Sequence, residues 1–284
     1  MQTDFHNLAA PAKLNLFLHV VGQRSDGYHL LESLFVLVDL MDSLDFDPLE
    51  RDALERTGAV VGDPEKDLCM RAARLLKART GCTKGVRINL TKRIPAGAGL
   101  GGGSSDAATT LIALNRLWDL KLNRQELIEI GAQLGADVPF FIFGRSAFAT
   151  GIGERLAALP VPDSSWAIVM PDTPTSTAGI FADPNLTRDT KSLKMHSLSE
   201  LIQSDWPRLP GHNDLQAVVE GKSPEVRRAL AFLGVGARMT GSGSAVFKHA
   251  PDREHAAAML SSLYKEASGY AVDTIHVHPL FAWV

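Results

Sequence analysis

The sequence predicts an α+β protein of two domains, each a β-sheet packed with helices. The chain has 284 residues and 45% hydrophobic content, which is enough to bury a large core. Segments of alternating polarity are interleaved with segments of helical periodicity, and several strands are joined by hairpin turns. A stretch rich in glycine and proline, 151–163, divides the chain. We therefore expect an N-terminal domain at 1–155 and a C-terminal domain at 156–284.

The first half is expected to open with a hairpin and to continue with helices and further strands. Residues 12–20 alternate in polarity, with Leu14 and Leu16 on one face and Lys13 and Asn15 on the other. An Asp-Gly pair follows as a hairpin signal. The elements predicted for this half are strands 12–20 and 34–38, helix 67–78, strand 86–90, helices 104–118 and 124–134, and a strand near 146–150.

The second half repeats this mixture of strands and helices around a polar excursion. Its predicted elements are strand 166–170, the excursion 183–212, helices 213–220 and 224–232, strand 237–239, a glycine turn at 240–244, strand 245–247, helix 253–267 and strand 274–277.

Two helix ends are predicted from capping chemistry. Ser104 or Ser105 is expected to cap the start of helix 104–118, because serine favours that position. Gly135 is expected to end helix 124–134, because glycine tolerates the left-handed conformation.

Composition excludes several classes of partner. The net charge of −3 gives no general attraction to nucleic acid or to an anionic membrane. No segment approaches the roughly 18 apolar residues needed to span a bilayer, and the N-terminus lacks a signal-peptide core. The two cysteines, Cys69 and Cys82, support neither a disulfide framework nor a metal cluster. We expect a cytoplasmic protein that binds neither nucleic acid nor membrane.

The segment Gly97 to Gly103 is the most informative part of the chain. Five of its seven positions lack a side chain, so the backbone can turn its N–H groups toward a bulky anion. The helix predicted next adds free N–H groups and the positive end of its dipole. We therefore predict a phosphate cradle formed by Pro95, Ala96, Gly97, Ala98, Gly99, Leu100, Gly101, Gly102, Gly103, Ser104 and Ser105.

Other glycine motifs fit this segment less well. Gly97, Gly99 and Gly102 satisfy the dinucleotide fingerprint, but strand 86–90 does not lead directly into the loop. Asp119, the acid nearest the expected spacing, falls at the end of the helix with no strand before it. The P-loop pattern fails because no Lys-Ser or Lys-Thr follows the glycines. A surface linker fits poorly because an apolar helix follows so closely.

Two charged residues are candidates for chemistry. Lys13 either reaches solvent or supplies a cation near a transferring phosphoryl group. Asp137 precedes the apolar run 138–143, and it either forms a turn hydrogen bond or accepts a hydroxyl proton. Tyr28 and His29 follow the hairpin turn, where they either pack or stack on a base.

Four blocks of sequence together resemble the GHMP kinase superfamily. They are Pro11-Ala-Lys-Leu-Asn-Leu-Phe-Leu18, Gly22-Gln-Arg-Ser-Asp-Gly-Tyr-His29, Gly135-Ala-Asp-Val-Pro139 and Thr240-Gly-Ser-Gly243, in addition to the glycine loop. The similarity spans most of the chain in the same order, although residues 183–235 carry little of it. The resemblance implies the two-domain GHMP kinase fold, with the active site in the cleft between the domains.

The resemblance also implies an activity, which is phosphorylation by ATP of a hydroxyl on a small cytidine diphosphate sugar alcohol. Asp137 would be the base and Lys13 would orient groups and stabilise charge. The residues implied to bind substrate are Asn15, Tyr28, His29, Thr177 and Phe181, with Phe181 on the opposite side of the cytosine ring. Mg²⁺ is expected to travel with ATP and to keep several waters, without a dedicated protein cage.

Asp67 departs from the family pattern, because relatives often carry Asn there, near the adenine. A carboxylate accepts hydrogen bonds but cannot donate them, which puts a purine contact at this position in doubt. The chain is expected to be a monomer or a homodimer. The alternatives are a related kinase acting on mevalonate or homoserine, a non-catalytic nucleotide sensor, and a nicotinamide oxidoreductase.

Overall fold

The structure is a computed structural model that describes residues 4–60, 63–173, 175–208 and 211–284. Positions 209 and 210 of the predicted polar excursion lie outside the described residues. Along the described part of the chain, no helix combines the length and the apolar character needed to cross a membrane.

The first half of the chain forms a sheet covered by helices. Its elements are β1 (Leu8–Gln23), β2 (His29–Leu49), β3 (Leu54–Gly58), η1 (Pro64–Lys66), α1 (Leu68–Thr80), β4 (Gly85–Thr91), α2 (Gly102–Leu117), α3 (Arg124–Gly131), α4 (Val138–Phe143), β5 (Ala147–Thr150) and β6 (Arg155–Ala158).

The second half has its own strands and helices. Its elements are β7 (Ser165–Pro171), α5 (Thr177–Phe181), α6 (Met195–Asp205), α7 (Asp214–Lys222), α8 (Pro224–Leu233), β8 (Arg238–Met239), β9 (Val246–Ala250), α9 (Arg253–Leu260), β10 (Ala267–Ile275) and η2 (Phe281–Trp283).

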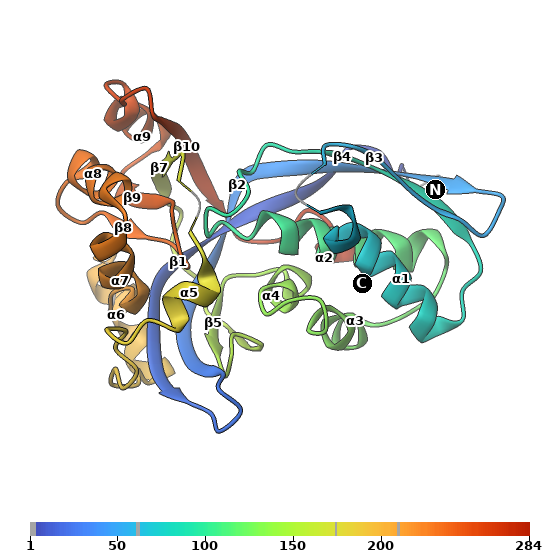
Figure 1. Ribbon diagram of the computed structural model, residues 1–284, viewed down its shortest axis with the longest axis horizontal. Coiled ribbons are helices and arrows are strands. Elements are labelled where there is room, and N and C mark those ends of the chain that lie inside the picture. Colours follow the sequence, from blue (N-terminus) through green and yellow to red (C-terminus); the bar gives the residue numbers. More distant parts are fainter. Residues whose placement is uncertain (1–3, 61–62, 174, 209–210) are drawn as a thin grey trace.

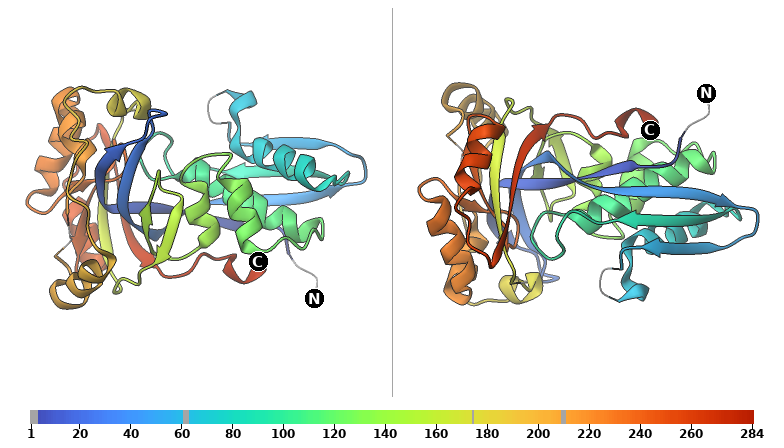
Figure 2. Two further views of the ribbon diagram at one scale, coloured as in Figure 1. Left: turned by 90° about the horizontal axis from the view of Figure 1, so that it is seen from below. Right: turned by 90° about the horizontal axis from the view of Figure 1, so that it is seen from above.

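The two halves lie side by side and share a sheet. The strand order is β3-β4-β2-β10-β7-β9-β8, with β1 paired to β2 and β5 paired to β2 and β6. Helices α1 to α4 gather on one side of the strands of the first half, and α7 to α9 cover the outer side of the strands of the second half (Figures 1 and 2). The halves are joined where β10 pairs with β2, at Thr274 opposite Val38 and Ile275 opposite Leu37.

The chain end returns to the first half, so the two halves are interlocked. The C-terminal end lies beside α1 and α2 in Figure 1. Leu280 packs into the core formed by α1 to α4 and their sheet. The proposed domain boundary, between residues 155 and 156, falls within β6, which pairs with β5. The boundary therefore stays a proposal.

Strand β1 is buried on both faces, which the alternation of its sequence did not predict. Leu14 and Leu16 are fully buried, and Lys13 and Asn15 on the other face are only 3% and 2% exposed. Irregularities in the β1–β2 register, including one between Asn15 and Leu18, bring Phe17 into the same core as Leu14 and Leu16. The polar residues of β1 therefore point into the protein.

A central core connects the site to both halves of the chain. It contains Leu14 from β1, Leu100 from the glycine loop, and Trp166 and Phe247 from β7 and β9. β7 is buried on both faces, because Ala167 and its alternate neighbours pack against the outer helices. The glycine loop is thus anchored by apolar side chains that belong to the interior of the molecule.

Most predicted elements are confirmed in place, with longer or shorter ends. Strands 86–90, 146–150 and 166–170 and helices 213–220 and 224–232 correspond to β4, β5, β7, α7 and α8. The prediction missed β3, α4, β6, α5, α6, η1 and η2, which are short or polar. The predicted helix 253–267 was wrong beyond residue 260, because α9 ends at Leu260 and residues 267–273 of β10 pair with β7.

Both predicted helix ends were wrong. α2 begins at Gly102 with Gly101 as its N-cap in the left-handed region (φ 73°), so Ser104 and Ser105 lie inside the first turn. Glycine can adopt this backbone conformation, which starts the helix earlier than a serine cap would. α3 ends at Gly131 with Ala132 as its C-cap, and Gly135 lies in the following turn, where its N–H bonds to the Gly131 carbonyl (3.4 Å).

The buried face of α2 is expected to dominate the stability of the first half. Leu111 is fully buried in the core with α1, α4 and the sheet. Leu111→Ala should lower the free energy of unfolding by about 2–5 kcal/mol, since it leaves a cavity. Urea unfolding measures this change. Arg74→Ala on the exposed face of α1 is the control and should stay within about 0.5 kcal/mol of the parent; a Leu111 variant as stable as this control would contradict the packing.

Candidate active site

A cavity of about 1130 Å³ lies between the two halves. Its lining comes from β1, the hairpin tip after β1, the start of α1, the glycine loop, the start of α4, α5 and the second glycine turn. All eighteen predicted site residues except Ser105 line it. Ser105 is fully buried behind the loop instead.

The glycine loop is held to the protein through its carbonyl groups. The Lys13 N–H donates to the Leu100 carbonyl (3.0 Å), and the Ala245 N–H donates to the Ala98 carbonyl (3.1 Å). The Gly101 carbonyl accepts from Ser105 N–H (2.9 Å) as the first bond of α2. Carbonyls that would repel an anion are therefore occupied by the protein.

Close approach to the second glycine turn requires glycine at position 99. A Cβ there would lie 2.3 Å from the Thr240 carbonyl oxygen, and its φ is +76°. Gly97 and Gly101 also have positive φ, at 70° and 73°. The loop conformation is one that residues with side chains rarely adopt.

The start of α2 presents free N–H groups at this loop. Its N-cap is Gly101, which has no side chain to accept from the first turn. Gly102 and Gly103 line the cavity beside it. A helix start without a side-chain cap is a favourable place for a phosphate group.

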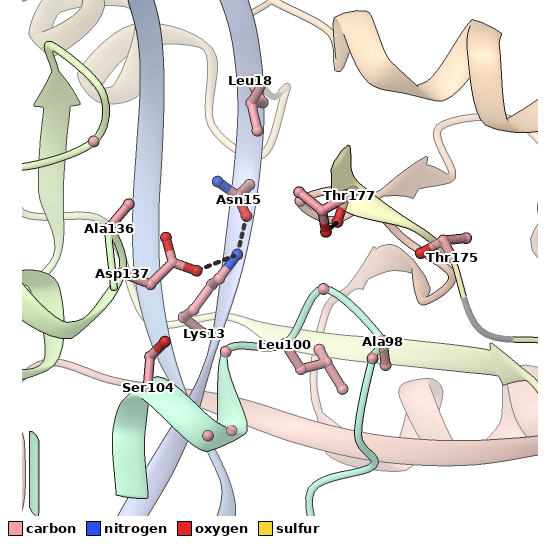
Figure 3. A pocket seen from close by; sticks show the side chains of 18 of the residues that line it. Lys13, Asn15, Leu18, Ala98, Leu100, Ser104, Ala136, Asp137, Thr175 and Thr177 are labelled. Atoms are coloured by element: carbon pink, nitrogen blue, oxygen red, sulfur yellow. Dashed lines mark hydrogen bonds and ion pairs between the residues drawn. The ribbon is translucent and has the colours of Figure 1, made fainter. Parts of the chain in front are cut away.

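Lys13 and Asp137 meet beside the loop. Lys13 Nζ lies 3.6 Å from Asp137 Oδ2, and it also donates to Asn15 Oδ1 (Figure 3). Asp137 is the residue before α4, and its side chain is 34% exposed to the cavity. Gly241 allows this crowding, because a Cβ there would lie 3.1 Å from Lys13 Nζ. The structure thus brings the two predicted catalytic side chains together.

The electrostatics of Lys13 depend on its partner. Burial lowers the pKa of Lys13, and the negative charge of Asp137 opposes this shift. The cation also lies 5.4 Å from the centroid of the Phe35 ring. Lys13 is therefore a buried cation, paired with one carboxylate, that lines the cavity beside the glycine loop.

Asn15 is fixed by a hydrogen-bond network that crosses between the halves. Its backbone N–H donates to Thr240 Oγ1 (2.9 Å), and its Nδ2 donates to Ser33 Oγ (2.8 Å). Ser33 in turn donates to the Phe17 carbonyl (2.6 Å). These bonds direct Asn15 Oδ1 toward Lys13.

The far end of the cavity carries aromatic rings. His29 and Phe181 are stacked on each other, with ring centroids 5.0 Å apart and an interplanar angle of 29°. That spacing leaves no room for a third ring between them. Tyr28 is 61% exposed at the hairpin tip, so it is the ring free to cover a base. Thr177 Oγ1 lies 2.7 Å from Ser242 Oγ at the start of α5.

Sequence reasoning missed a buried network behind the loop. Lys92 Nζ bonds to Asp42 Oδ2 (2.5 Å) and Asp106 Oδ2 (2.9 Å). Asp42 also accepts from the N–H groups of Arg93 (2.6 Å) and Ile94 (2.9 Å), which hold the segment leading into the loop. Asp42 lies in a strand, and no local pattern marks it; only Lys92 and Asp106 stand close to the glycines in sequence.

The surroundings of Asp106 in this network raise its pKa. Burial raises its pKa to about 7, Lys92 opposes this shift, and the charge of Asp42 adds to it. Burial acts on Lys92 in the opposite sense, but the two carboxylates outweigh it and raise the pKa of Lys92. Asp106 Oδ1 is buried and has no hydrogen-bond partner among the residues that the structure describes. The network therefore holds more negative charge than one lysine balances.

Asp67 lines the cavity at the start of α1, where it has two partners. It caps α1 by accepting from the Met70 N–H (3.0 Å), and it pairs with Arg56 Nε (3.0 Å). Arg56 lies on β3 and was not singled out from the sequence. The ion pair balances the charge of a carboxylate that lines the cavity beside Leu68.

A magnesium ion accompanying ATP fits the oxygen atoms at the phosphate end. Ser104 and Asp137 approach the same part of the cavity (Figure 3). Among the described residues, no group of three or more His, Cys, Asp or Glu side chains is arranged to hold a metal. One or two protein oxygens suffice for Mg²⁺ that is bound chiefly by phosphates and water.

Comparison with known proteins identifies both halves. The family model for the GHMP kinases N terminal domain matches residues 67–145, and that for the GHMP kinases C terminal domain matches residues 190–268. A protein of Ralstonia pickettii (strain 12J), 4-diphosphocytidyl-2-C-methyl-D-erythritol kinase, is 49% identical over 98% of this chain and 96% of its own length.

Solved structures agree with these sequence matches. A crystal structure of 4-(cytidine 5'-diphospho)-2C-methyl-D-erythritol kinase has a TM-score of 0.82 and 34% identity, and covers 94% of this chain and 98% of that chain. Mevalonate kinase from Methanococcus jannaschii has a TM-score of 0.71 at 15% identity, covering 97% and 99% of the two chains. The second match shows a shared fold only.

Gly99→Ala is expected to disable the cradle. Its Cβ would collide with the Thr240 carbonyl, so the loop must move away from the second turn. ATP affinity should fall at least about tenfold, since one displaced contact of about 1.4 kcal/mol has that effect; calorimetry with ATP measures it. Gly81→Ala is the control, with the same left-handed backbone (φ +69°) but open space around its Cβ. Equal ATP affinities in both variants would contradict the role of this contact.

Asp106→Asn is expected to change how stability depends on pH. The pKa of Asp106 is about 7 in the folded protein and near 4 in the unfolded chain. The folded state therefore holds the proton more tightly, which stabilises the parent protein most fully below about pH 4. This stabilisation is lost as the pH rises to about 7. The melting temperature of the variant minus that of the parent should therefore be higher at pH 8 than at pH 5. The exposed Asp189→Asn is the control and should show no such trend; a pH-independent difference for Asp106→Asn would reject the raised pKa.

Proposed function

Since this chain belongs to the GHMP kinases, we propose that it transfers the terminal phosphate of ATP to the 2-hydroxyl of 4-diphosphocytidyl-2-C-methyl-D-erythritol. This reaction is a step of the non-mevalonate route to isoprenoid precursors. Relatives named for this kinase that align along nearly the whole chain support the substrate. The meeting of Lys13 and Asp137 beside the glycine cradle is the observation that carries the chemistry.

Asp137 acts as the general base in this proposal. Its carboxylate accepts the proton of the substrate hydroxyl while the hydroxyl oxygen bonds to the terminal phosphorus and the bond from that phosphorus to ADP breaks. Lys13 Nζ, 3.6 Å from the carboxylate, stabilises the negative charge on the transferring group and orients Asp137. Positioning and charge supply most of the rate, since little covalent chemistry falls to the protein in phosphoryl transfer.

The triphosphate is held by main-chain atoms. Within the loop from Pro95 to Ser105, the glycines and the start of α2 supply free N–H groups, as the carbonyl anchoring of the loop allows. The Ser104 hydroxyl and the Asp137 carboxylate would stand beside a magnesium ion bound with ATP, which would supply positive charge to neutralise the phosphates.

The cytidyl substrate occupies the aromatic end of the cavity. Tyr28 covers one face of the cytosine, and the His29–Phe181 pair borders the base at the same end of the cavity. Asn15 and Thr177 contact the polar part of the substrate between the rings and the phosphate end. A cytoplasmic location and a monomeric or homodimeric state stay predictions.

The experiment that tests this function compares substrates and a base variant. ADP release should be much faster with the cytidyl compound than with mevalonate or homoserine. Asp137→Asn should lower kcat by about 10²–10⁴-fold with ATP affinity within a few-fold of the parent, because it removes the base and keeps the shape. Asp119→Asn is the matched control, at an exposed acid on a positive-φ position that asparagine tolerates.

Four outcomes would contradict the proposal. Equal turnover of mevalonate or homoserine would assign the chain to another kinase of the family. ATP binding without turnover of any alcohol would favour a nucleotide sensor. An Asp137→Asn variant as active as the Asp119 control would show that Asp137 is not the base. Competition of NAD(H) with ATP would favour the oxidoreductase alternative.

A further inference from the structure

Arg188 attaches the polar excursion to the aromatic end of the cavity. Its Nε–H donates to Nε2 of His29 (3.1 Å), and its Nη2 donates to the Phe181 carbonyl (3.0 Å). Two further bonds reach the carbonyls of Asp183 (2.8 Å) and Leu186 (3.0 Å). A guanidinium held by four acceptors is fixed in one orientation, and it fixes the ring beside it.

The bond to Arg188 determines which nitrogen of His29 carries a proton. A guanidinium only donates hydrogen bonds, so Nε2 of His29 must accept with its lone pair. A neutral imidazole with a bare Nε2 carries its proton on Nδ1. Among the hydrogen bonds of the described residues, none uses Nδ1 of His29, and His29 lines the cavity. The ring therefore offers an N–H donor to a ligand.

The charge environment favours the same form. Burial lowers the pKa of His29, and the positive charge of Arg188 lowers it further. The imidazolium form, which has no acceptor nitrogen, is thus disfavoured at neutral pH. The stacked Phe181 ring restricts rotation of the imidazole and keeps Nε2 facing Arg188.

We propose that Arg188 is a positioning residue that sets the tautomer of His29 and so makes the cavity select cytosine over uracil. The inference rests on the proposed function, because it concerns the base of the same substrate. The two bases differ at N3, which is an acceptor in cytosine and an N–H donor in uracil, whereas both carry the same O2 acceptor. A donor fixed opposite N3 therefore bonds to cytosine, but opposite uracil two donors face each other and cannot bond.

Nitrogen-15 NMR of the imidazole rings tests the tautomer without any ligand. The chain has nine histidines, and the signals of His29 are identified by their loss in His29→Gln. We expect the proton on Nδ1 at neutral pH in the parent protein. In Arg188→Met, we expect a mixture of tautomers and a higher pKa of His29. A parent ring protonated on Nε2, or on both nitrogens, would overturn the proposal.

Calorimetry with CDP and UDP tests the consequence for base selection. The parent should bind CDP at least about tenfold more tightly than UDP, since an unpaired donor costs on that order. Arg188→Met should bring this ratio toward one, and Arg188→Lys, which keeps a donor, should restore part of it. Lys222→Met is the control: it breaks the ion pair of Lys222 with Asp183 and loosens the same segment without touching His29.

The ratio separates positioning from simple loosening of the segment. Loosening weakens CDP and UDP equally, so Lys222→Met should leave the ratio unchanged. If the parent turns over the cytidyl substrate but Arg188→Met leaves the CDP-to-UDP affinity ratio unchanged, only the role of Arg188 is overturned. A parent that does not turn over the cytidyl substrate would overturn the proposed function instead, and the NMR experiment would still read the tautomer.

Discussion

The contact between two side-chain-free segments is the constraint on which the site depends. At Gly99 the glycine loop approaches the second glycine turn so closely that a Cβ would lie 2.3 Å from the Thr240 carbonyl. The hydrogen bonds of Ala98 and Leu100 fasten the same loop to the second half and to β1. One stretch of backbone is therefore held by both halves of the molecule. Because its carbonyls are used in this attachment, its surface toward the cavity is free to receive an anion.

This arrangement explains why charged residues are buried on β1. Both faces of the strand are covered, so Lys13 must lie in the interior, and burial disfavours its charge. The charge of Asp137, 3.6 Å away, offsets the free-energy cost of burying the Lys13 cation. Because the buried cation would be unfavourable without this partner, Lys13 stays beside Asp137. The same balance recurs behind the loop, where Lys92 lies between Asp42 and Asp106. The phosphate end is thus stiffened by charge pairs as well as by packing.

What could be predicted from the sequence was what nearby residues determine. The glycine loop, Lys13 and Asp137 stand in short blocks whose composition indicates phosphate chemistry, and the structure brings them together. The serine cap was wrong because Gly101 takes a left-handed conformation that only the assembled loop requires. The early start of β10 depends on pairing with β7, about 100 residues away in sequence. No local pattern could reveal it.

Arg188 shows the same limit for the substrate end. It contacts His29 from 159 residues away, within a polar excursion where no local pattern marks it. The two ends of the cavity also differ in kind. Main-chain N–H groups hold phosphate and cannot distinguish one nucleoside from another, because every nucleotide carries the same phosphates. In the proposed function, discrimination comes from side chains at the aromatic end, whose donors are oriented by residues outside the loop. Phosphoryl transfer and base recognition would then be carried by different parts of the chain. We therefore expect a change in the excursion to alter which base is accepted while Lys13 and Asp137 keep their geometry.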